Sequence, residues 1–371
     1  MKFLHTADLH LDSAFCADTA TASAARRAEQ REVLKRIFDT AKKNDCDMIL
    51  IAGDLFDTVL VTPETRELCL SLFSDFKKPI VISPGNHDPY VNGSFYKTPL
   101  PENVCVFSST ELQYFDFPSL GTTVAGYAFT SQSLPTSPLE GQVISRENES
   151  ILLLCAHTEL DTPTSRYAPV LSADLARHGF TYCALGHVHN IPTTAENIRY
   201  CGFAEGRSFD ELGDGGVLIV EINENGELDV KKHTVSEHRF LWEEISVDGL
   251  GDIENIEKTI REKIKELVGD KKTHLRIELT GATNADISRE LPNITADELP
   301  LLCSLKITDN TLCLPDRDFL RKDPSLRGEL YRVLEDKLMG EDPAERARAL
   351  KALKIGLAAI DGKDFTDGGR A

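Results

Sequence analysis

Five short clusters of polar residues between positions 8 and 189 carry side chains of the kind that bind divalent metals. Each cluster follows an apolar stretch of the sequence. The clusters are Asp8-Leu9-His10, Gly53-Asp54-Leu55-Phe56-Asp57, Gly85-Asn86-His87-Asp88, His157 and Gly186-His187-Val188-His189. Carboxylate, imidazole and amide-oxygen ligands suit manganese, iron or zinc, and one carboxylate can bridge two ions. The residue types therefore predict a metal site if the fold brings the clusters together.

Taken singly, most of these clusters have an ordinary structural explanation. The stretch GDLFD suits a turn followed by a helix cap, and His157 alone suits a buried, hydrogen-bonded histidine. The stretch GNHD is more specific, because a turn needs Gly-Asn but does not need the following His-Asp. The ordered occurrence of all five favours a joint site. The remaining histidines are expected to be core or surface residues: His5, His178, His233, His238 and His274.

The elements that would position these clusters alternate between strand-like and helix-like stretches, which predicts a layered α/β domain. Loops at the carboxyl ends of strands converge in open α/β sheets, so clusters far apart in sequence can meet in one crevice. If the strands stay extended, residues two apart, such as Asp8 and His10, point to the same face. Gly53, Gly85 and Gly186 are expected where the backbone bends sharply or approaches a ligand. The predicted strands are Phe3–Thr6, Met48–Ala52, Ile80–Ser83, Val104–Phe107, Ile151–Cys155, Tyr182–Leu185 and Val217–Ile222.

A second unit is expected to begin near Phe240. A strand over 241–248 is followed by a helix with isoleucines on one face that ends near Gly269, and two further strands complete a small α/β module. Helices over 326–339 and 344–360 follow, and the tail 362–371 is expected to be disordered. These patterns predict three domains, with residues 1–238 as the catalytic domain, 239–314 as a capping domain and 315–371 as a C-terminal helical region.

Composition limits the partners of the chain. The 371 residues carry a net charge of −19, and residues 240–320 hold 10 basic and 17 acidic side chains. A protein that holds nucleic acid on a broad basic surface is thereby disfavoured. The 9 cysteines lack CxxC spacing and are interpreted as buried thiols of a reducing compartment. No apolar run approaches the ~18 residues of a membrane span, and the N-terminus lacks the pattern of a secretory signal. A cytoplasmic protein without a membrane partner is expected.

The ordered set DxH, GDxxD, GNHD, H and GHxH resembles the calcineurin-like metallophosphoesterase superfamily. More narrowly, the stretches ADLHLD, LIAGDLFD, PGNHD, ALGHVH and IRYCGFAEGRSFDELGDGGVLIVEI resemble the SbcD-type DNA repair exonucleases, with the YhaO-like bacterial subgroup as the best fit. The resemblance spans residues 1–222. It implies an α/β metallophosphoesterase sandwich of two sheets flanked by helices. By position and size alone, it also implies a small α/β capping domain and a C-terminal helical pair that docks an SMC-like ATPase of the SbcC type.

The resemblance also implies roles for individual residues. It assigns His87 as the catalytic histidine that protonates or orients the leaving oxygen, with Asp57 orienting that ring. Some relatives carry His at the position of Asp57, which leaves the partner of His87 open. Two divalent metals are implied, with manganese expected and iron or zinc as alternatives. The implied ligands are Asp8, His10 and His189 for one ion, Asn86, His157 and His187 for the other, and Asp54 as the bridging carboxylate.

Three further residues are candidates for supporting roles. Asp12 and Asp88 are candidates to orient the second nitrogen of ligand histidines, as metal sites generally require. Arg207 is either a solvated surface residue or a bidentate clamp on the substrate phosphate.

The leading hypothesis is a two-metal, manganese-dependent DNA exonuclease that acts in DNA repair. Two metals would polarise a phosphoryl oxygen and make a water acidic, while an imidazole assists the leaving oxygen. The acidic chain is expected to bind DNA weakly alone and to depend on the ATPase partner or on homodimerisation. The alternative is a small-molecule phosphodiesterase or phosphatase that uses the same site. A non-enzymatic scaffold is disfavoured, because every matching ligand is present.

Overall fold

The computed structural model describes residues 1–15, 20–142, 151–190, 195–248, 250, 252–283, 287, 300–313, 317–340 and 342–360. The chain forms two compact units, Met1–Phe240 and Leu241–Ala371. The first boundary lies close to the predicted domain end at residue 238. The separation of a capping domain from a helical region near residue 314 stays a prediction, and the predicted disordered tail lies outside the described residues.

The first sheet of the first unit has the strand order β13-β12-β1-β2-β3-β4. Strands β1 to β4 run parallel, whereas β12 is antiparallel to both β1 and β13. The parallel strands end at the same edge of the sheet, where four successive loops begin. The strands span β1 Lys2–Thr6, β2 Met48–Ile51, β3 Ile80–Ile82, β4 Val104–Val106, β12 Gly213–Ile222 and β13 Leu228–Ser246, the last of which continues into the second unit.

The second sheet has the order β11-β10-β7-β6-β5, and all its pairs are parallel except β5 with β6. A short parallel pair, β8 with β9, lies beyond β7 in the chain. Both large sheets are therefore mixed. The strands span β5 Gln113–Phe117, β6 Thr122–Gly126, β7 Ile151–His157, β8 Glu159–Leu160, β9 Pro169–Val170, β10 Tyr182–Gly186 and β11 Ile198–Tyr200, and two 3₁₀ turns span Phe95–Lys97 and Pro118–Leu120.

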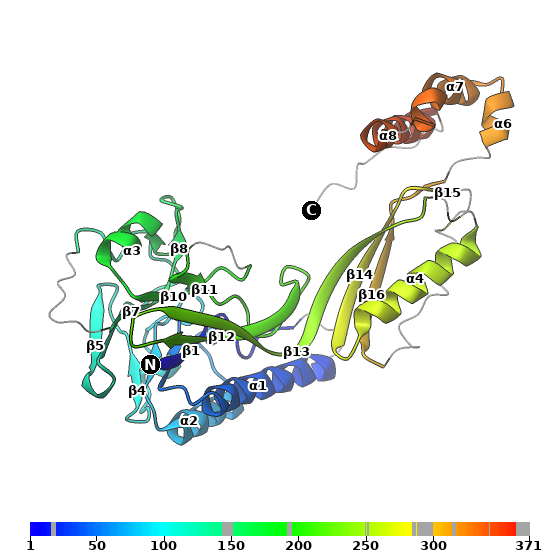
Figure 1. Cartoon of the computed structure of the whole chain (residues 1–371). Helices are drawn as coiled ribbons and strands as arrows, with labels where there is room; N and C mark the ends of the chain where they lie inside the picture. The colour runs from blue at the N-terminus through cyan, green and yellow to red at the C-terminus, as the bar shows by residue number, and fades with distance from the viewer. Residues whose placement is uncertain are drawn as a thin grey trace. The chain divides into compact units, whose positions relative to one another are not determined.

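Alternating side chains of the first sheet form two different cores. Leu4 and Ile49 point to the face covered by helices α1 (Ala20–Lys43) and α2 (Pro63–Phe76), where they pack with Ile37. Phe3 and Leu50 point to the other face and pack against the second sheet. Figure 1 shows α1 and α2 along one side of this unit. The parallel strands are therefore buried on both faces. This explains why their sequences are continuous hydrophobic runs and do not alternate between apolar and polar residues.

The outer face of the second sheet is covered by helix α3 (Ser172–His178). Leu154 and Leu185 of that sheet pack with Leu175 of the helix. Figure 1 shows α3 on the side of this sheet that faces away from α1 and α2. The resulting helix–sheet–sheet–helix sandwich confirms the predicted fold class. Helix α3 and strand β11 were not predicted, because each is too short to show a clear period in the sequence.

The second unit contains a small α/β module. Helix α4 (Ile253–Val268) begins at the capping residue Asp252 and ends before Gly269. Its Ile256, Ile260 and Ile264 pack on strand β14 (Lys272–Thr280), which pairs in parallel with β16 (Leu302–Asp309). A short parallel pair consists of β15 (Ala282–Thr283) and β17 (Leu312–Cys313). The strand–helix–strand pattern predicted near Phe240 is therefore present.

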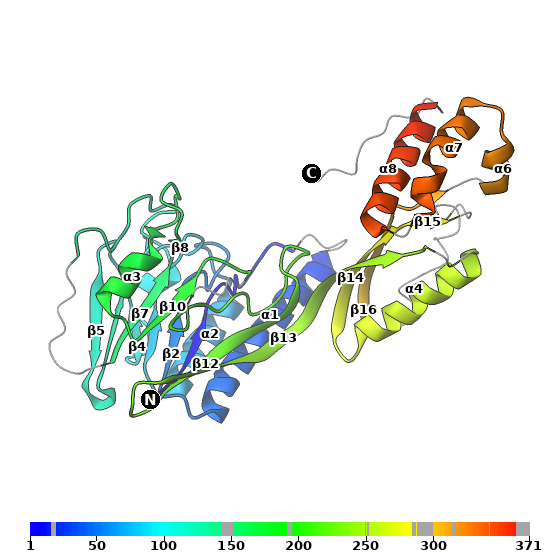
Figure 2. The ribbon, with the colours of Figure 1, turned by 45° about the horizontal axis from the view of Figure 1, so that its top comes forward.

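Three helices follow, namely α6 (Arg317–Lys322), α7 (Leu326–Leu338) and α8 (Pro343–Ile360). Leu320, Tyr331 and Leu353 form a small core among them. Figure 2 shows α7 and α8 side by side, with α6 next to α7. The two predicted C-terminal helices are confirmed, and α6 is an addition.

The burial of the cysteines and the length of the apolar helices bear on two expectations from the sequence. Among the described cysteines most are buried, but Cys303 is exposed, so the interpretation of the cysteines as buried thiols is wrong at that position. In the described part of the chain, no helix is both long enough and apolar enough to cross a membrane.

Candidate metal centre

The loop after β1 leaves the extended conformation at once. Asp8 and His10 have φ angles of 53° and 46°, in the left-handed region. The expectation that an extended strand points both side chains to one face is therefore wrong. The backbone instead bonds sideways to the loop after β2, with Asp8 N–H donating to the Gly53 carbonyl at 3.1 Å and His10 N–H to the Asp54 carbonyl at 2.9 Å. Because these two loops are joined along their backbones, their polar side chains lie close together.

The expected close approach of glycine backbone is found at the site. A Cβ on Gly53 would lie 2.3 Å from Nδ1 of His157, and one on Gly85 would lie 2.1 Å from Oδ1 of Asp54. A Cβ on Gly186 would lie 2.0 Å from the Ala52 carbonyl oxygen. Each distance is far below any van der Waals contact, so only glycine allows the loops to pack this tightly.

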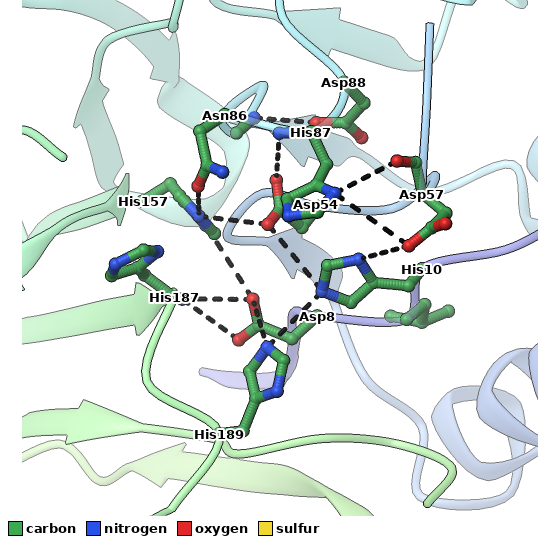
Figure 3. Close-up of polar contacts among 12 residues, drawn as sticks. Asp8, His10, Asp54, Asp57, Asn86, His87, Asp88, His157, His187 and His189 are labelled. Atoms are coloured by element: carbon green, nitrogen blue, oxygen red, sulfur yellow. Dashed lines mark hydrogen bonds and ion pairs between the residues drawn. The ribbon is translucent and has the colours of Figure 1, made fainter. Parts of the chain in front are cut away.

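One cluster of possible metal ligands consists of Asp8, His10 and His189, whose ligand atoms lie within 4.8 Å of one another. The Nε2 atoms of the two histidines are 3.3 Å apart, and Nε2 of His189 is 3.7 Å from Oδ1 of Asp8. Figure 3 shows these side chains converging from the loop that follows β1 and the loop that follows β10. Two imidazole nitrogens beside a carboxylate form a donor set that suits a divalent first-row metal.

A neighbouring cluster consists of Asp8, Asp54 and His157. Nε2 of His157 lies 3.3 Å from Oδ2 of Asp54 and 2.9 Å from Oδ1 of Asn86. Oδ2 of Asp54 also lies 3.7 Å from Nε2 of His10, which belongs to the first cluster. Asp54 therefore stands between the two clusters, where a bridging carboxylate would stand (Figure 3).

The pKa values in the two clusters are set by burial and by close carboxylate–histidine pairs. Burial raises the pKa of Asp8. Burial opposes ionisation of Asp54 as well, but His157 beside it holds the pKa of Asp54 well below its usual range. Burial also disfavours a charged His157, yet Asp54 and Asp8 raise its pKa to about 9. A buried carboxylate needs a compensating positive charge. His157 supplies that charge to Asp54 here, and a divalent cation would supply more of it.

His187 is placed differently from the other predicted ligands. Its backbone N–H donates to Oδ2 of Asp8 at 3.0 Å, while its ring packs at 4.7 Å on Tyr167. Its Nε2 lies 4.0 Å from Glu159. Burial, together with the neighbouring His157, lowers the pKa of His187 to about 3. Within the described residues, the ring of His187 belongs to neither of the two clusters.

His87 is the most exposed of the predicted site residues, with 44% of its side chain accessible. Its Nδ1–H donates to the backbone carbonyl of Asp57 at 3.0 Å, and its backbone N–H donates to Oδ1 of Asp54 at 3.0 Å. The carboxylate of Asp57 is 3.9 Å from His87 but only 3.2 Å from Nδ1 of His10. Asp57 thus contacts His87 through its carbonyl and His10 through its carboxylate.

A cavity of about 450 Å³ opens beside His87. Its walls combine site residues with residues of two further loops. They are Asp57, Thr58, Val59, Asn86, His87, Gln132, Ser133, Arg166 and Tyr167. The exposed side of the site is therefore bordered by one cationic and one aromatic side chain.

The prediction that Asp12 and Asp88 orient ligand histidines is wrong in the described part of the chain. Asp88 accepts bonds from the backbone N–H groups of Phe56 and Gly85. Asp12 accepts bonds from Thr62 at the start of α2. Both carboxylates satisfy nearby backbone donors and hold loops in place, which a short acidic side chain does readily.

Glu211 is a site residue that the sequence reasoning missed. Its Oε1 accepts the Nδ1–H of His189 at 2.8 Å, and its side chain is only 3% exposed. Arg207 forms an ion pair with the same carboxylate at 2.6 Å and a weaker one with Asp57 at 3.4 Å. Arg207 is therefore not a solvated surface residue. The spacing of four residues between Arg207 and Glu211 was the available signal.

The other histidines include a clear core residue. His5 is fully buried, and its ring nitrogens bond the Tyr182 hydroxyl and the Leu185 carbonyl, each at 3.1 Å. Burial lowers the pKa of His5 to about 3. A structural role was expected for this histidine, and its contacts agree with that role.

Known proteins are similar in sequence to the part of the chain that contains the two clusters. A sequence model of the family described as calcineurin-like phosphoesterase matches residues 1–190. The chain is 29% identical over 261 residues to the uncharacterized metallophosphoesterase YhaO of Bacillus subtilis, and the match covers 67% of this chain and 63% of YhaO. The chain thus spans less than two thirds of the length of that relative.

Two further relatives are each named as the D component of the nuclease SbcCD. The chain is 26% identical over 333 residues to the Staphylococcus epidermidis protein, covering 80% of this chain and 84% of the relative. It is 26% identical over 300 residues to the Bacillus subtilis protein, covering 68% and 74%. A solved structure of a dimetal phosphatase from Danio rerio aligns with a TM-score of 0.37 and 10% identity, over 63% of this chain and 96% of that chain.

Proposed function

Because the chain belongs to the calcineurin-like phosphoesterase family, whose members hydrolyse phosphoester bonds, we propose that it is a manganese-dependent DNA exonuclease of DNA repair. The observation that carries the proposal is the convergence of two ligand clusters on Asp54, built from Asp8, His10 and His189 on one side and from Asp8 and His157 on the other. The alternative substrate is a small phosphodiester or phosphomonoester.

The proposed ligands fit two divalent ions. Asp8, His10 and His189 would hold one ion, His157 and Asn86 the other, and Asp54 would bridge them. Such a pair of ions would polarise the phosphoryl oxygens and lower the pKa of a water that attacks phosphorus. His187 is kept as a proposed ligand of the second ion, for which its ring would have to turn from its present contact with Tyr167.

His87 is proposed to act on the leaving oxygen. Its Nδ1 is held by the Asp57 carbonyl, which leaves Nε2 as the nitrogen that can give up a proton. The ring borders the cavity beside the site. When protonated on both ring nitrogens, the imidazole can donate the Nε2 proton to an alkoxide and then recover a proton from solvent.

The cavity beside His87 supports a nucleotide as the substrate. Arg166 and Tyr167 line it together with Asn86 and His87. An aromatic face can stack on a base, and a guanidinium can bind the next phosphate. The cavity volume of about 450 Å³ lies within the roughly 300–1,000 Å³ that is typical of small-ligand sites. The nuclease components among the relatives favour the same substrate class.

Partners are proposed to supply the affinity for DNA that the acidic chain lacks. Residues 1–240 hold 20 Lys and Arg against 33 Asp and Glu. Helix α7 exposes Leu326 and Val333, and Met339 follows it. Apolar side chains exposed on a helix suit a protein contact. We assign this surface to an SMC-like ATPase of the SbcC type, with a homodimer as the second route to a larger DNA-binding surface.

The test compares linear duplex DNA with bis(4-nitrophenyl) phosphate, each with manganese and with excess chelator. The proposal expects release of nucleotides from DNA ends and loss of all hydrolysis with chelator. Hydrolysis of the aryl diester with intact DNA, even with an ATPase partner present, would favour the small-molecule alternative. Failure of manganese to bind would contradict both.

A further inference from the structure

A chain of hydrogen bonds surrounds the cluster formed by Asp8, His10 and His189. Nδ1 of His10 lies 3.2 Å from the Asp57 carboxylate, and Nδ1 of His189 lies 2.8 Å from the Glu211 carboxylate. A carboxylate accepts but cannot donate, so the proton of each ring sits on Nδ1. The two Nε2 atoms then carry lone pairs. They face each other at 3.3 Å, as two ligands of one cation would.

Arg207 joins the two carboxylates. Its Nη1 lies 3.4 Å from Asp57, while its Nη2 and Nε donate to Oε1 of Glu211 at 2.6 and 3.0 Å. Its backbone N–H also donates to Oε2 of Glu211 at 2.8 Å. The guanidinium therefore supplies the counter-charge that the nearly buried Glu211 requires. Each of its three nitrogens has an acidic partner, and each Nη keeps a second N–H.

We propose that Arg207 and Glu211 are positioning residues: they hold His189 directly, and His10 through Asp57, with both Nε2 atoms aimed at one shared ion. Carboxylates that orient metal-bound histidines affect metal affinity by about 10–100-fold. The inference rests on the proposed metal site. It adds that a single arginine couples the two histidines of one ion, whereas His157, held by the Ala52 carbonyl at 3.0 Å, stands outside this network.

The test measures bound manganese by elemental analysis and by titration calorimetry on the full chain. Glu211→Gln and Arg207→Ala are expected to weaken one of the two ions by about 10–100-fold and to leave the other unchanged. Electron paramagnetic resonance should then show isolated rather than coupled manganese. Arg207→Lys keeps the positive charge, so it is less prone to misfold than Arg207→Ala. It is expected to weaken the binding of the same ion. Arg36→Ala is the matched control. It removes an ion pair of 2.6 Å between Arg36 and Glu237, which are not among the site residues, and it should bind manganese as wild type does.

Two outcomes would overturn the inference. Wild-type affinity for both ions in Glu211→Gln and Arg207→Lys would do so. A raised KM for substrate in Arg207→Lys, with both ions bound at full affinity, would instead support Arg207 as a substrate clamp. If wild type itself bound no manganese, the proposed function would fail, and that failure is distinguishable because it does not depend on the variants.

Discussion

At the scale of single residues, His87 and Asp54 differ in what they contact. His87 stands at the exposed edge of the site, whereas Asp54 lies within 4 Å of histidines from both ligand clusters. We expect His87→Asn to lower turnover by about 10²–10⁴-fold while bound manganese stays near the wild-type amount. Asp54→Asn should lose both manganese and activity. Turnover with either substrate and metal content are the measurements.

His233→Asn provides the control for the His87 variant, since His233 lies in strand β13 opposite Val217 of β12 and outside both clusters. It should keep wild-type turnover and metal content. Equal loss of manganese in His87→Asn and Asp54→Asn would contradict the assignment of different roles to these residues, with His87 as a proton donor and Asp54 as a bridging ligand.

The buried His5 predicts a pH dependence of stability. Its pKa is lowered to about 3 in the folded state, against 6.5 for an ordinary solvated histidine. Between these values the unfolded chain binds a proton that the folded chain does not. Stability from this group is therefore complete above pH 6.5 and falls with decreasing pH, by about 1.4 kcal/mol per pH unit.

The measurement is the free energy of unfolding in chelator at several pH values between 4 and 7, for wild type, His5→Gln and the control His233→Gln. The slope against pH should decrease in His5→Gln and not in His233→Gln. Parallel curves for all three proteins would show that His5 contributes nothing to the acid sensitivity.

The sequence identified residue types well and residue contacts poorly. Asp8, His10 and Asp54 can be proposed as ligands from the sequence because each is a chemically suitable residue that follows an apolar strand. Glu211 was missed, because its importance arises only where it meets His189 in the fold. The roles expected for Asp12 and Asp88 failed for a related reason, since a short acidic side chain in a loop bonds the nearest backbone donors.

At the scale of elements, the turn after β3 sets the position of Asp54. A Cβ on Gly85 would lie 2.1 Å from Oδ1 and 2.6 Å from the backbone nitrogen of Asp54. We expect Gly85→Ala to displace this carboxylate, to weaken manganese binding and to destabilise the first unit by about 1–3 kcal/mol. Metal titration and thermal unfolding are the measurements.

Gly340→Ala is the matched control, because a Cβ there would meet its nearest atoms at an ordinary 3.5 Å. It should change neither property. Full metal affinity in Gly85→Ala would mean that the turn relaxes at little cost and that glycine there does not position Asp54.

The order of elements was largely predictable, and the conformation of their ends was not. All seven strands predicted in the first unit are present, since short apolar runs bounded by polar turns are typical of buried strands. The left-handed residues Asp8 and His10 give no such signal, because a non-glycine residue adopts that conformation only when its surroundings impose it. Prediction therefore failed at the loops, where the proposed ligands lie.

At the scale of the whole molecule, charge governs the interaction with DNA. Both the first 240 residues and the segment 240–320 carry more acidic than basic side chains. We expect the isolated chain to bind linear duplex DNA with a dissociation constant of about 1 μM or weaker at physiological salt. Addition of an ATPase partner should tighten binding strongly. Fluorescence anisotropy over a salt series measures both.

Nanomolar binding by the isolated chain would contradict this account of the charge. A steep loss of affinity with salt would point to the same conclusion, because it would reveal many lysine and arginine contacts to phosphate. Serum albumin at equal concentration serves as an acidic protein that provides no DNA site.

The clusters around Asp54 draw on both sheets of the sandwich: Asp8 and Asp54 follow strands of one, whereas His157 and His189 belong to strand ends of the other. Cations held there would join the two layers at this edge, in addition to the apolar core and to hydrogen bonds such as that of His157 with the Ala52 carbonyl. Removal of metal would then lower the stability of the packing between the two sheets as well as abolish activity. The reason is that any ligand that binds only the native state stabilises that state.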